Sequence, residues 1–458
     1  MTDLSRRAFL QRSAALGIVG GAAPFVMNLA AIGEAAAATA GDYKALVCIF
    51  LFGGNDYANT VTPYDQASYD QYAALRGTIA HTRDSLTATA LSPTNPLSGG
   101  RQFALAPNLS PLMPIFNAGR LGVVLNVGAL VQPTSKTNYT ARSVPLPPKL
   151  FSHNDQQSFW QASSPEGATS GWGGRIGDLL QSGNGASALT CISAAGNSIY
   201  LAGRTAIQYA VTTTGPIPLL NNATTLFGSG AGMTALRGLM TGARTNLFEN
   251  EHATVSRRSI DLQAQVTAAL AGSPTVTTPF PANTGNLAEQ LRIVLRLISV
   301  SQELGARRQV FFVSLGGFDT HDSVLTTHPV LMTRLGLAMR YFYDATVELG
   351  IANRVTTFTG SDFGRTLTSN ANGSDHGWGS HHFVMGGAVN GRAFYGTPPA
   401  IANNGPDDVG QGRLLPSLAV DQYGSTLANW FGVSAGQMST VLPNINNYNP
   451  STWNLGFV

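Results

Sequence analysis

Charged side chains are scarce in this chain. They make up 11% of the 458 residues, and the formal net charge is only +3. No run is rich in lysine and arginine, so the sequence lacks the basic patch that binds nucleic acid, and we exclude nucleic acid as a partner. The 51 glycines instead predict long ordered loops, as in many secreted proteins, and 43% hydrophobic residues are enough for a large core.

Cysteine is almost missing as well. The chain has two, Cys48 and Cys191, and each lies in an apolar stretch. Two buried free thiols are one interpretation. An exported protein could also oxidise the pair to a single disulfide. The sequence leaves both interpretations open.

Long apolar runs are missing after residue 40. No later segment has 18 or more consecutive apolar residues, so we expect no stable membrane span in the mature chain. The first 40 residues contain the twin-arginine pattern Ser5-Arg6-Arg7-Ala8-Phe9-Leu10, and a weakly apolar run, Ala14–Ala31, follows it. That run contains several glycines and Pro24, which argues against a membrane anchor. The small residues Ala35–Ala40 supply a cleavage site.

These features predict a twin-arginine signal peptide over residues 1–40 and a mature chain over residues 41–458. We therefore expect a periplasmic or secreted bacterial protein that has the twin-arginine export machinery as one partner. This machinery moves proteins that are already folded, which suits a protein that loads a cofactor before export.

The mature chain opens with a continuous apolar run, Lys44–Phe52. Such a run is typical of a strand that is buried on both faces of a parallel sheet. Gly53 and Gly54 then allow a sharp turn, which leaves Asp56 near the carboxyl end of the strand. A similar run, Leu121–Val127, predicts a second buried strand.

Strands and helices alternate in the second half of the chain. A helical stripe of apolar residues ends near Gly305, and the strand Val310–Leu315 follows. A helix over residues 330–349 leads to the strand Val355–Thr359, which makes a parallel strand–helix–strand unit. A further strand at Phe383–Met385 and a last helix over Ser417–Phe431 complete the pattern. We predict one α/β domain, a three-layer α/β/α sandwich with a mostly parallel central sheet, with residues 183–285 as a cap or an insertion.

Histidine and aspartate gather at the ends of these predicted strands. Five of the eight histidines lie between Gln309 and Gly387, namely His321, His328, His376, His381 and His382. Asp319 and His321 follow one buried strand, and Asp362 follows the next. Because carboxyl ends of parallel strands meet at one edge, we expect these groups and Asp56 to form a metal site. The alternative for each aspartate is a cap on the turn or helix that follows it.

The segment from Asp375 to His382 is dense in candidates. His376 is the preferred metal ligand, because Asp375 precedes it and a glycine follows it. We expect three residues to contact the metal ligands rather than the metal, and so to orient a ligand or a substrate oxyanion; they are Asp375, His381 and His382. The alternative is a glycine-rich surface loop with solvated histidines.

Three further residues are candidates for catalysis. Arg365 is placed to clamp a phosphate or sulfate group through its guanidinium, although a structural salt bridge explains it equally well. Ser152, with His153 beside it, begins a predicted helix, where backbone N–H groups favour a bound anion or an attacking alkoxide. A plain N-cap explains Ser152 as well as a nucleophile does.

Several of these motifs occur together and in order. They are the twin-arginine leader, Phe52-Gly53-Gly54-Asn55-Asp56, Ser152-His153-x-x-x-Gln157, Gly316-Gly317-Phe318-Asp319-Thr320-His321, Ser361-Asp362-Phe363-Gly364-Arg365-Thr366 and Asp375-His376-Gly377-Trp378-Gly379. With them, essentially the whole mature chain resembles the twin-arginine-exported bacterial family called domain of unknown function 1501. That family is a distant relative of the alkaline phosphatase and sulfatase superfamily.

The resemblance implies an alkaline-phosphatase-like sandwich with one or two metals at the carboxyl edge of the sheet and a hydroxyl nucleophile nearby. Matched by position, Asp56 corresponds to the ligand after the first strand, and Asp319 with His321 to the pair that holds one metal. Asp362 corresponds to the aspartate of an Asp-His pair, and His376 to the last histidine ligand. Phe363 stands where that pair has its histidine, and His321 follows Asp319 more closely than usual.

The favoured function is therefore an exported metal-dependent hydrolase of phosphate or sulfate esters. Its substrate is expected to be a small anionic ester, sulfated or phosphorylated, and its cofactor one or two divalent ions, zinc or calcium. The alternative is a catalytically inactive exported binding or surface-assembly protein on the same fold, which the phenylalanine at position 363 motivates.

Overall fold

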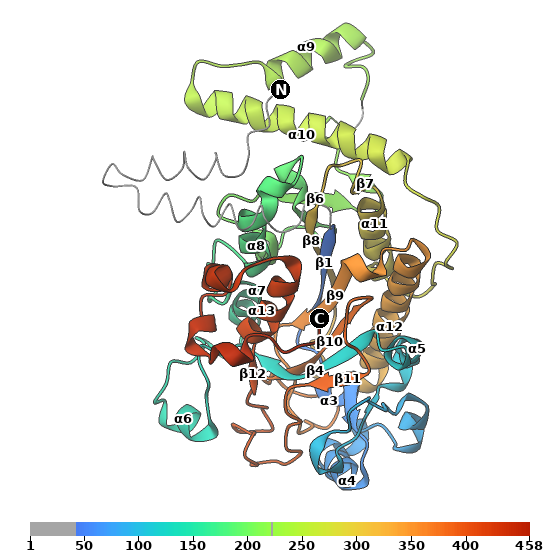
Figure 1. The fold of residues 1–458 in the computed structure, drawn as a ribbon, viewed down its shortest axis with the longest axis vertical. Coiled ribbons are helices and arrows are strands. Elements are labelled where there is room, and N and C mark those ends of the chain that lie inside the picture. Colours follow the sequence, from blue (N-terminus) through green and yellow to red (C-terminus); the bar gives the residue numbers. More distant parts are fainter. Residues whose placement is uncertain (1–42, 221–222) are drawn as a thin grey trace, which may run out of the picture.

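The computed structural model describes residues 43–220 and 223–458. The predicted signal peptide over residues 1–40 lies outside the described residues. Within them, ten strands form one mixed sheet, with the order β11-β4-β10-β9-β1-β8-β5-β6-β7 and with β12 beside β4 (Figure 1). A separate two-stranded ribbon pairs β2 (Val61–Pro63) with β3 (Phe103–Leu105).

The centre of the sheet is parallel. The strand β1 (Lys44–Phe52) lies between β8 (Arg308–Gly316) and β9 (Val355–Ser361) and is parallel to both. The three apolar runs thus form the buried strands that the sequence predicts. The helix α12 (Val324–Glu348) connects β8 to β9 and crosses over β1.

Shorter strands extend the sheet on both sides. On one side β10 (Ser380–Gly386) runs antiparallel to β9 and to β4 (Leu121–Gly128). The strands β11 (Ala393–Tyr395) and β12 (Leu418–Ala419) are parallel to β4. On the other side lie β5, β6 and β7, with bounds Cys191–Ser193, Gln208–Thr212 and Gly215–Pro216. The sheet is mostly parallel, as predicted.

The two faces of β1 bury different clusters of side chains. Its alternate residues Val47 and Ile49 join a core beneath α11 (Leu287–Ser299) and α12. Cys48 and Phe50 face the other core, beneath α8 (Trp172–Leu180) and α13 (Val420–Phe431). Because side chains alternate along a strand, a run that is apolar throughout needs a cover on each face. The α/β/α layering predicted from the sequence is therefore confirmed.

Residues 183–285 contain two kinds of structure. Their first part supplies β5, β6 and β7 to the sheet, and their second part forms α9 (Gly230–Thr241) and α10 (Leu247–Ala271). These two helices pack on each other at the end of the molecule that carries β6 and β7 (Figure 1). The remaining α-helices of the described residues are α3 (Tyr57–Thr60), α4 (Gln66–Arg76), α5 (Met113–Asn117), α6 (Lys136–Ala141), α7 (His153–Ala162) and α14 (Met438–Val441).

Some element boundaries differ from prediction. The helix α12 begins at Val324 rather than at residue 330 and contains Pro329. The last helix begins at Val420, because Leu418 and Ala419 pair with β4 first.

Cys48 and Cys191 are buried free thiols on strands separated by β8. No helix within the described residues is both long and apolar enough to cross a membrane.

Candidate metal centre

The site lies where β1, β8 and β9 end at one edge of the sheet. Gly53 follows β1 with a positive φ of 115°, which is open to glycine but strained for other residues. A Cβ atom at Gly53 would lie 2.4 Å from the backbone nitrogen of Asp319. The glycine therefore lets the loop after β8 approach the end of β1, and so brings Asp319 beside Asp362.

Three histidines surround one carboxylate oxygen, Oδ1 of Asp319. The Nε2 atoms of His321, His376 and His153 lie 3.1, 3.3 and 3.5 Å from it, respectively. The Nε2 atoms of His321 and His376 lie 2.9 Å apart. Ligand atoms of His153, Asp319 and His376 all lie within 4.8 Å of one another. Residues from three separate parts of the chain thus meet at Asp319, with His321 close to Asp319 and to His376.

The other ring nitrogen of each histidine is held by an acceptor. The Nδ1 atom of His153 lies 2.7 Å from Oδ2 of Asp362. The Nδ1 atom of His321 lies 3.0 Å from Oδ1 of Asp375. The Nδ1 atom of His376 lies 2.7 Å from the carbonyl oxygen of Phe151. Because these acceptors take a hydrogen bond only from a protonated Nδ1, they favour the tautomer whose Nε2 carries a lone pair. Three lone pairs and a carboxylate then face one another, an arrangement that a cation stabilises.

Asp362 holds His153 from a buried position. Its Oδ2 also accepts hydrogen bonds from the Gln157 side chain at 2.8 Å and from the Gly53 N–H at 3.1 Å. Its Oδ1 is buried and has no hydrogen-bond partner among the described residues. The hydrogen bond to Asp362 raises the pKa of His153, although burial opposes the change.

Arg365 fixes Asp319 in place. Its guanidinium is fully buried and donates to Oδ1 of Asp319 at 2.8 Å and to the carbonyl oxygen of Gly53 at 3.2 Å. The rest of the guanidinium binds the carbonyl oxygen of Ser374. Burial raises the pKa of Asp319, but the hydrogen bond and charge of Arg365 outweigh burial, so the carboxyl titrates below its usual range. The structure therefore shows Arg365 as a buried partner of Asp319.

Phe363 packs against two of the histidines, whose own rings lie 4.3 Å apart. The centre of its ring lies 4.9 Å from that of His153 and 4.8 Å from that of His376. A Cβ atom at Gly54 would lie 2.5 Å from the Phe363 ring, so that glycine makes room for it. The side chain that replaces the expected histidine thus forms an apolar wall of the site.

The donor set fits a single zinc ion. Tetrahedral zinc, with bonds of about 2.0–2.1 Å, places its ligand atoms roughly 3.3–3.4 Å apart. The distances of 3.1, 3.3 and 3.5 Å from the histidines to Asp319 are close to that spacing, whereas the 2.9 Å between the Nε2 atoms of His321 and His376 is shorter than it. Of the five ligands predicted from the sequence, three lie close together here, namely Asp319, His321 and His376. Asp362 is hydrogen-bonded to the far ring nitrogen of His153, Nδ1.

Asp56 has different contacts. Its carboxylate pairs with Arg76 of α4, and both side chains are at most 1% exposed. It also accepts hydrogen bonds from the Ser374 hydroxyl at 3.3 Å and from the Asn59 N–H at 3.3 Å, the latter as the N-cap of α3. Burial raises the pKa of Asp56, and the charges of Arg76 and His328 outweigh it, so the net change is downward. The structure assigns Asp56 to a buried ion pair.

One comparison with known proteins covers most of the chain. A family model described as "Protein of unknown function (DUF1501)" matches residues 43–413. The chain belongs to the DUF1501 family. This match confirms the family named from the sequence motifs. A search of curated proteins finds no match.

Solved structures offer only remote likenesses to this DUF1501 member. Ps i-CgsB in complex with k-i-k-neocarrahexaose aligns with a TM-score of 0.35 and 10% identity, over 89% of this chain and 77% of that one. A variant of alkaline phosphatase PafA aligns with a TM-score of 0.26 and 10% identity, over 72% and 64% of the two chains. A Bacteroides thetaiotaomicron protein from a locus for the metabolism of glycosaminoglycans aligns with a TM-score of 0.32 and 10% identity, over 86% of this chain and 73% of that one.

Ser152 and two other candidates make hydrogen bonds or ring contacts of their own outside the histidine cluster of this DUF1501 site. Ser152 is the N-cap of α7, and its hydroxyl donates to Oδ2 of Asp155 at 3.1 Å. His381 is buried on β10, where its Nδ1 accepts from the Asn126 N–H at 3.1 Å. His382, also buried, has its ring beside Trp160. Burial lowers the pKa of His381 and of His382 to about 3, so both are neutral core residues.

Three groups in the DUF1501 site have positions or contacts that were not predicted, although His153 itself was a predicted catalytic residue. His153, expected beside a nucleophile, stands with the candidate ligands, and Gln157, one helical turn later, binds the same carboxylate. Their spacing of four residues on a helix is a signal that the sequence does contain. Arg413 donates from Nε to the carbonyl oxygen of His376 at 3.1 Å, and its guanidinium stacks on Phe151. The sequence gives no comparable signal for Arg413, which comes from a distant loop.

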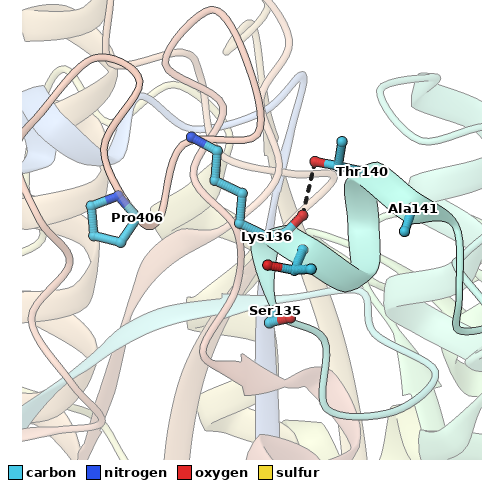
Figure 2. A pocket seen from close by; sticks show the side chains of 6 residues that line it. Ser135, Lys136, Thr140, Ala141 and Pro406 are labelled. Carbon is cyan, nitrogen blue, oxygen red and sulfur yellow. Dashed lines mark hydrogen bonds between the residues drawn. The ribbon is translucent and has the colours of Figure 1, made fainter.

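An open cavity of about 710 Å³ lies elsewhere on the surface, beside α6 (Figure 2). It is lined by Ser135, Lys136, Thr137, Thr140, Ala141 and Pro406. The Lys136 ammonium donates to the carbonyl oxygens of Asn404 and Gly405, which ties α6 to the loop across the cavity. No candidate ligand lines this cavity, so the chemistry of the DUF1501 site rests on the histidine cluster.

Proposed function

We propose that this DUF1501 member is a zinc-dependent hydrolase of phosphate or sulfate esters, which acts in the periplasm or outside the cell after twin-arginine export. The observation that carries the proposal is the convergence of three imidazole Nε2 atoms on Oδ1 of Asp319. Three nitrogens and one oxygen form a typical zinc set, whereas calcium prefers six to eight oxygens. The donors favour zinc over calcium.

The same geometry favours one ion rather than two. The four donor atoms come from His153, His321, His376 and Asp319, and one tetrahedral ion uses all of them. Phe363 fills the space beside His153 and His376 with a hydrocarbon ring. Asp56, the ligand expected after the first strand, is paired with Arg76 instead.

A zinc ion held there would supply Lewis acidity, which polarises an ester oxygen and lowers the pKa of a coordinated water. Side chains of the protein orient and charge the candidate ligands. Asp362 holds His153 in the tautomer that leaves Nε2 free, and Arg365 keeps Asp319 ionised. The terminal nitrogens of Arg413 have no hydrogen-bond partner among the described residues, so this guanidinium is available to bind the anionic group of a substrate.

Metal analysis and hydrolysis assays on the same preparations test the proposal. We expect about one zinc per folded chain and turnover of an aryl phosphate or an aryl sulfate. Asp319→Ala and His376→Ala should lose both the zinc and the activity. His252→Ala removes an exposed histidine of α10 and should retain both. Absence of bound metal, together with an unchanged rate in Asp319→Ala, would reject the proposal.

Ser152 gives a separate test of the nucleophile. Its hydroxyl is hydrogen-bonded to Asp155, and we expect water rather than this serine to attack the ester. Ser152→Ala should therefore keep its rate within about fivefold, whereas loss of a true nucleophile costs several orders of magnitude. A fall of a thousandfold in this variant, with zinc retained, would assign the attack to Ser152.

A second candidate function is binding without turnover. The side chain of Phe363 favours this second function. Its apolar ring lies beside His153 and His376, at the position where the resemblance leads us to expect a histidine. This alternative predicts that the zinc-loaded protein binds inorganic phosphate or sulfate stoichiometrically in a calorimeter but forms no product from either ester. Measurable turnover that depends on Asp319 would exclude it.

A further inference from the structure

One apolar stripe runs along the whole of α10. Leu262, Val266 and Leu270 lie on it in the second half of the helix and are buried in the core with α11 and α12. Phe248 and Val255 precede Leu262 at intervals of seven residues, so they lie on the same face. The stripe that docks α10 on the body therefore continues into the first half of the helix.

In that first half the stripe is uncovered. Phe248 is 83% exposed, Val255 is 48% exposed, and the adjacent Leu247 is 77% exposed. Other sides of this half are covered, because Ala253 and Ser256 are buried and α9 packs on the helix. Figure 1 shows both helices at one end of the molecule, outside the layers of the sheet. Single exposed apolar residues are ordinary, but a helical stripe of them indicates a contact surface.

Two opposite charges lie on the same stripe. Glu251 and Arg258 are seven residues apart, which is two turns or about 10 Å along a helix. Both are exposed, and neither has an ion-pair partner among the described residues. When two such helices pair antiparallel about a two-fold axis near residue 254, each Glu251 lies opposite the Arg258 of the other copy. The stripe is thus complementary in charge to itself.

We infer that the first half of α10 is the contact surface of a two-fold symmetric homodimer, in which α10 pairs antiparallel with α10 of a second copy. Self-complementary charge selects a second copy over an unrelated partner, because a two-fold interface uses the same surface twice. Phe248 and Val255 supply the apolar part of the contact, and the two Glu251–Arg258 pairs fix the register.

Sedimentation equilibrium of the purified full-length chain tests this inference. The native chain should be dimeric at micromolar concentration. Phe248→Glu combined with Val255→Glu should be monomeric while its circular dichroism spectrum stays unchanged, since both side chains are exposed. Val347→Glu is the matched control, because Val347 is 50% exposed on α12 and lies outside the stripe, and it should remain dimeric. A native chain that is monomeric throughout overturns the inference.

Charge reversal tests the antiparallel register. Glu251→Arg alone and Arg258→Glu alone should each raise the dimer dissociation constant at least about tenfold, because each places like charges opposite one another twice. The double reversal restores both pairs and should return the constant to within about threefold of the native value. Failure of the double variant to recover rejects this pairing. A monomer that binds anionic lipid vesicles through Phe248 would assign the surface to a membrane instead.

Discussion

The Nδ1 atom of His153 lies 2.7 Å from Oδ2 of Asp362, and this hydrogen bond aims the Nε2 atom of His153 at Asp319. The ends of β8 and β9, on either side of β1, place the two aspartates, but the histidine comes from a helix whose first residue it is. The carboxylate of Asp362 thus acts on the site through an imidazole. Such supporting hydrogen bonds orient metal ligands and raise their basicity.

Asp362→Asn should weaken zinc binding by about 10- to 100-fold, because it removes the charge that supports His153. Competition with a chromophoric chelator measures this affinity. Asp375→Asn is the matched comparison, since Asp375 supports His321 in the same way from an exposed position, with half of its side chain accessible. We expect the exposed variant to lose less affinity. Equal affinities in Asp362→Asn and the native chain would refute the role given to Asp362.

Asp56→Ala should destabilise the fold by about 3–5 kcal/mol, because it leaves the Arg76 guanidinium buried without its counter-charge. Urea unfolding measures the free energy. The exposed pair Glu289–Arg292 supplies the control, and Arg292→Ala should cost no more than about 1 kcal/mol. The folded fraction of Asp56→Ala should still bind one zinc. Loss of the zinc at unchanged stability would instead make Asp56 a ligand.

Arg413→Gln should raise the KM for an anionic ester roughly tenfold or more while kcat changes less, because the guanidinium is expected to contact the charged group in both the ground state and the transition state. Zinc content should stay the same, since Arg413 contacts the backbone of His376 and not its ring. Arg413→Lys should recover only part of the affinity, since an ammonium lacks the planar fork. A KM unchanged in Arg413→Gln would contradict this role.

The protein should lose stability as the pH falls from about 6.5 to 4. Burial lowers the pKa of His328 to about 4, and that of His381 and of His382 to about 3, whereas histidines in the unfolded chain titrate near 6.5. The unfolded chain therefore binds more protons in this window, and each histidine costs at most about 1.4 kcal/mol per pH unit. Asp421 acts in the opposite direction, because burial raises its pKa to about 6.

The three histidines should outweigh Asp421, so the thermal midpoint should drop across this window. Scanning calorimetry at several pH values between 7 and 4 measures it. His252→Gln, which replaces an exposed histidine, should leave the slope unchanged. A midpoint that stays constant from pH 7 to pH 4 would show that the buried histidines do not control stability.

Much of the central sheet could be predicted from the sequence. A strand that is covered on both faces is expected to be apolar, and this requirement marks β1, β4 and most of β8 in the sequence itself, whereas β9 is buried although it contains three threonines. The position of β1 between β8 and β9 could not be predicted, because strand order depends on crossover paths and not on local composition. Likewise, the antiparallel direction of β10 leaves no local signature.

The site was less predictable, and the reason differs from residue to residue. Asp319 and Asp362 follow buried strands, so sheet geometry brings them together. Asp56 also follows a buried strand, but its counter-charge Arg76 lies at the end of a helix, where sequence position does not reveal the pairing. His381 and His382 share a polar segment with His376, yet they belong to a buried strand, and composition alone does not separate them.

The pairing of β1 has a consequence for synthesis of the protein. Lys44 pairs with Arg308, and Ala45 pairs with Val355, so the first strand finds its neighbours only after some 300 later residues have been made. Contacts between such distant residues slow folding, and an unpaired apolar strand is prone to aggregate meanwhile. A ribosome-bound chain should therefore depend on chaperones until β9 emerges, and truncated forms that end before β9 should be insoluble.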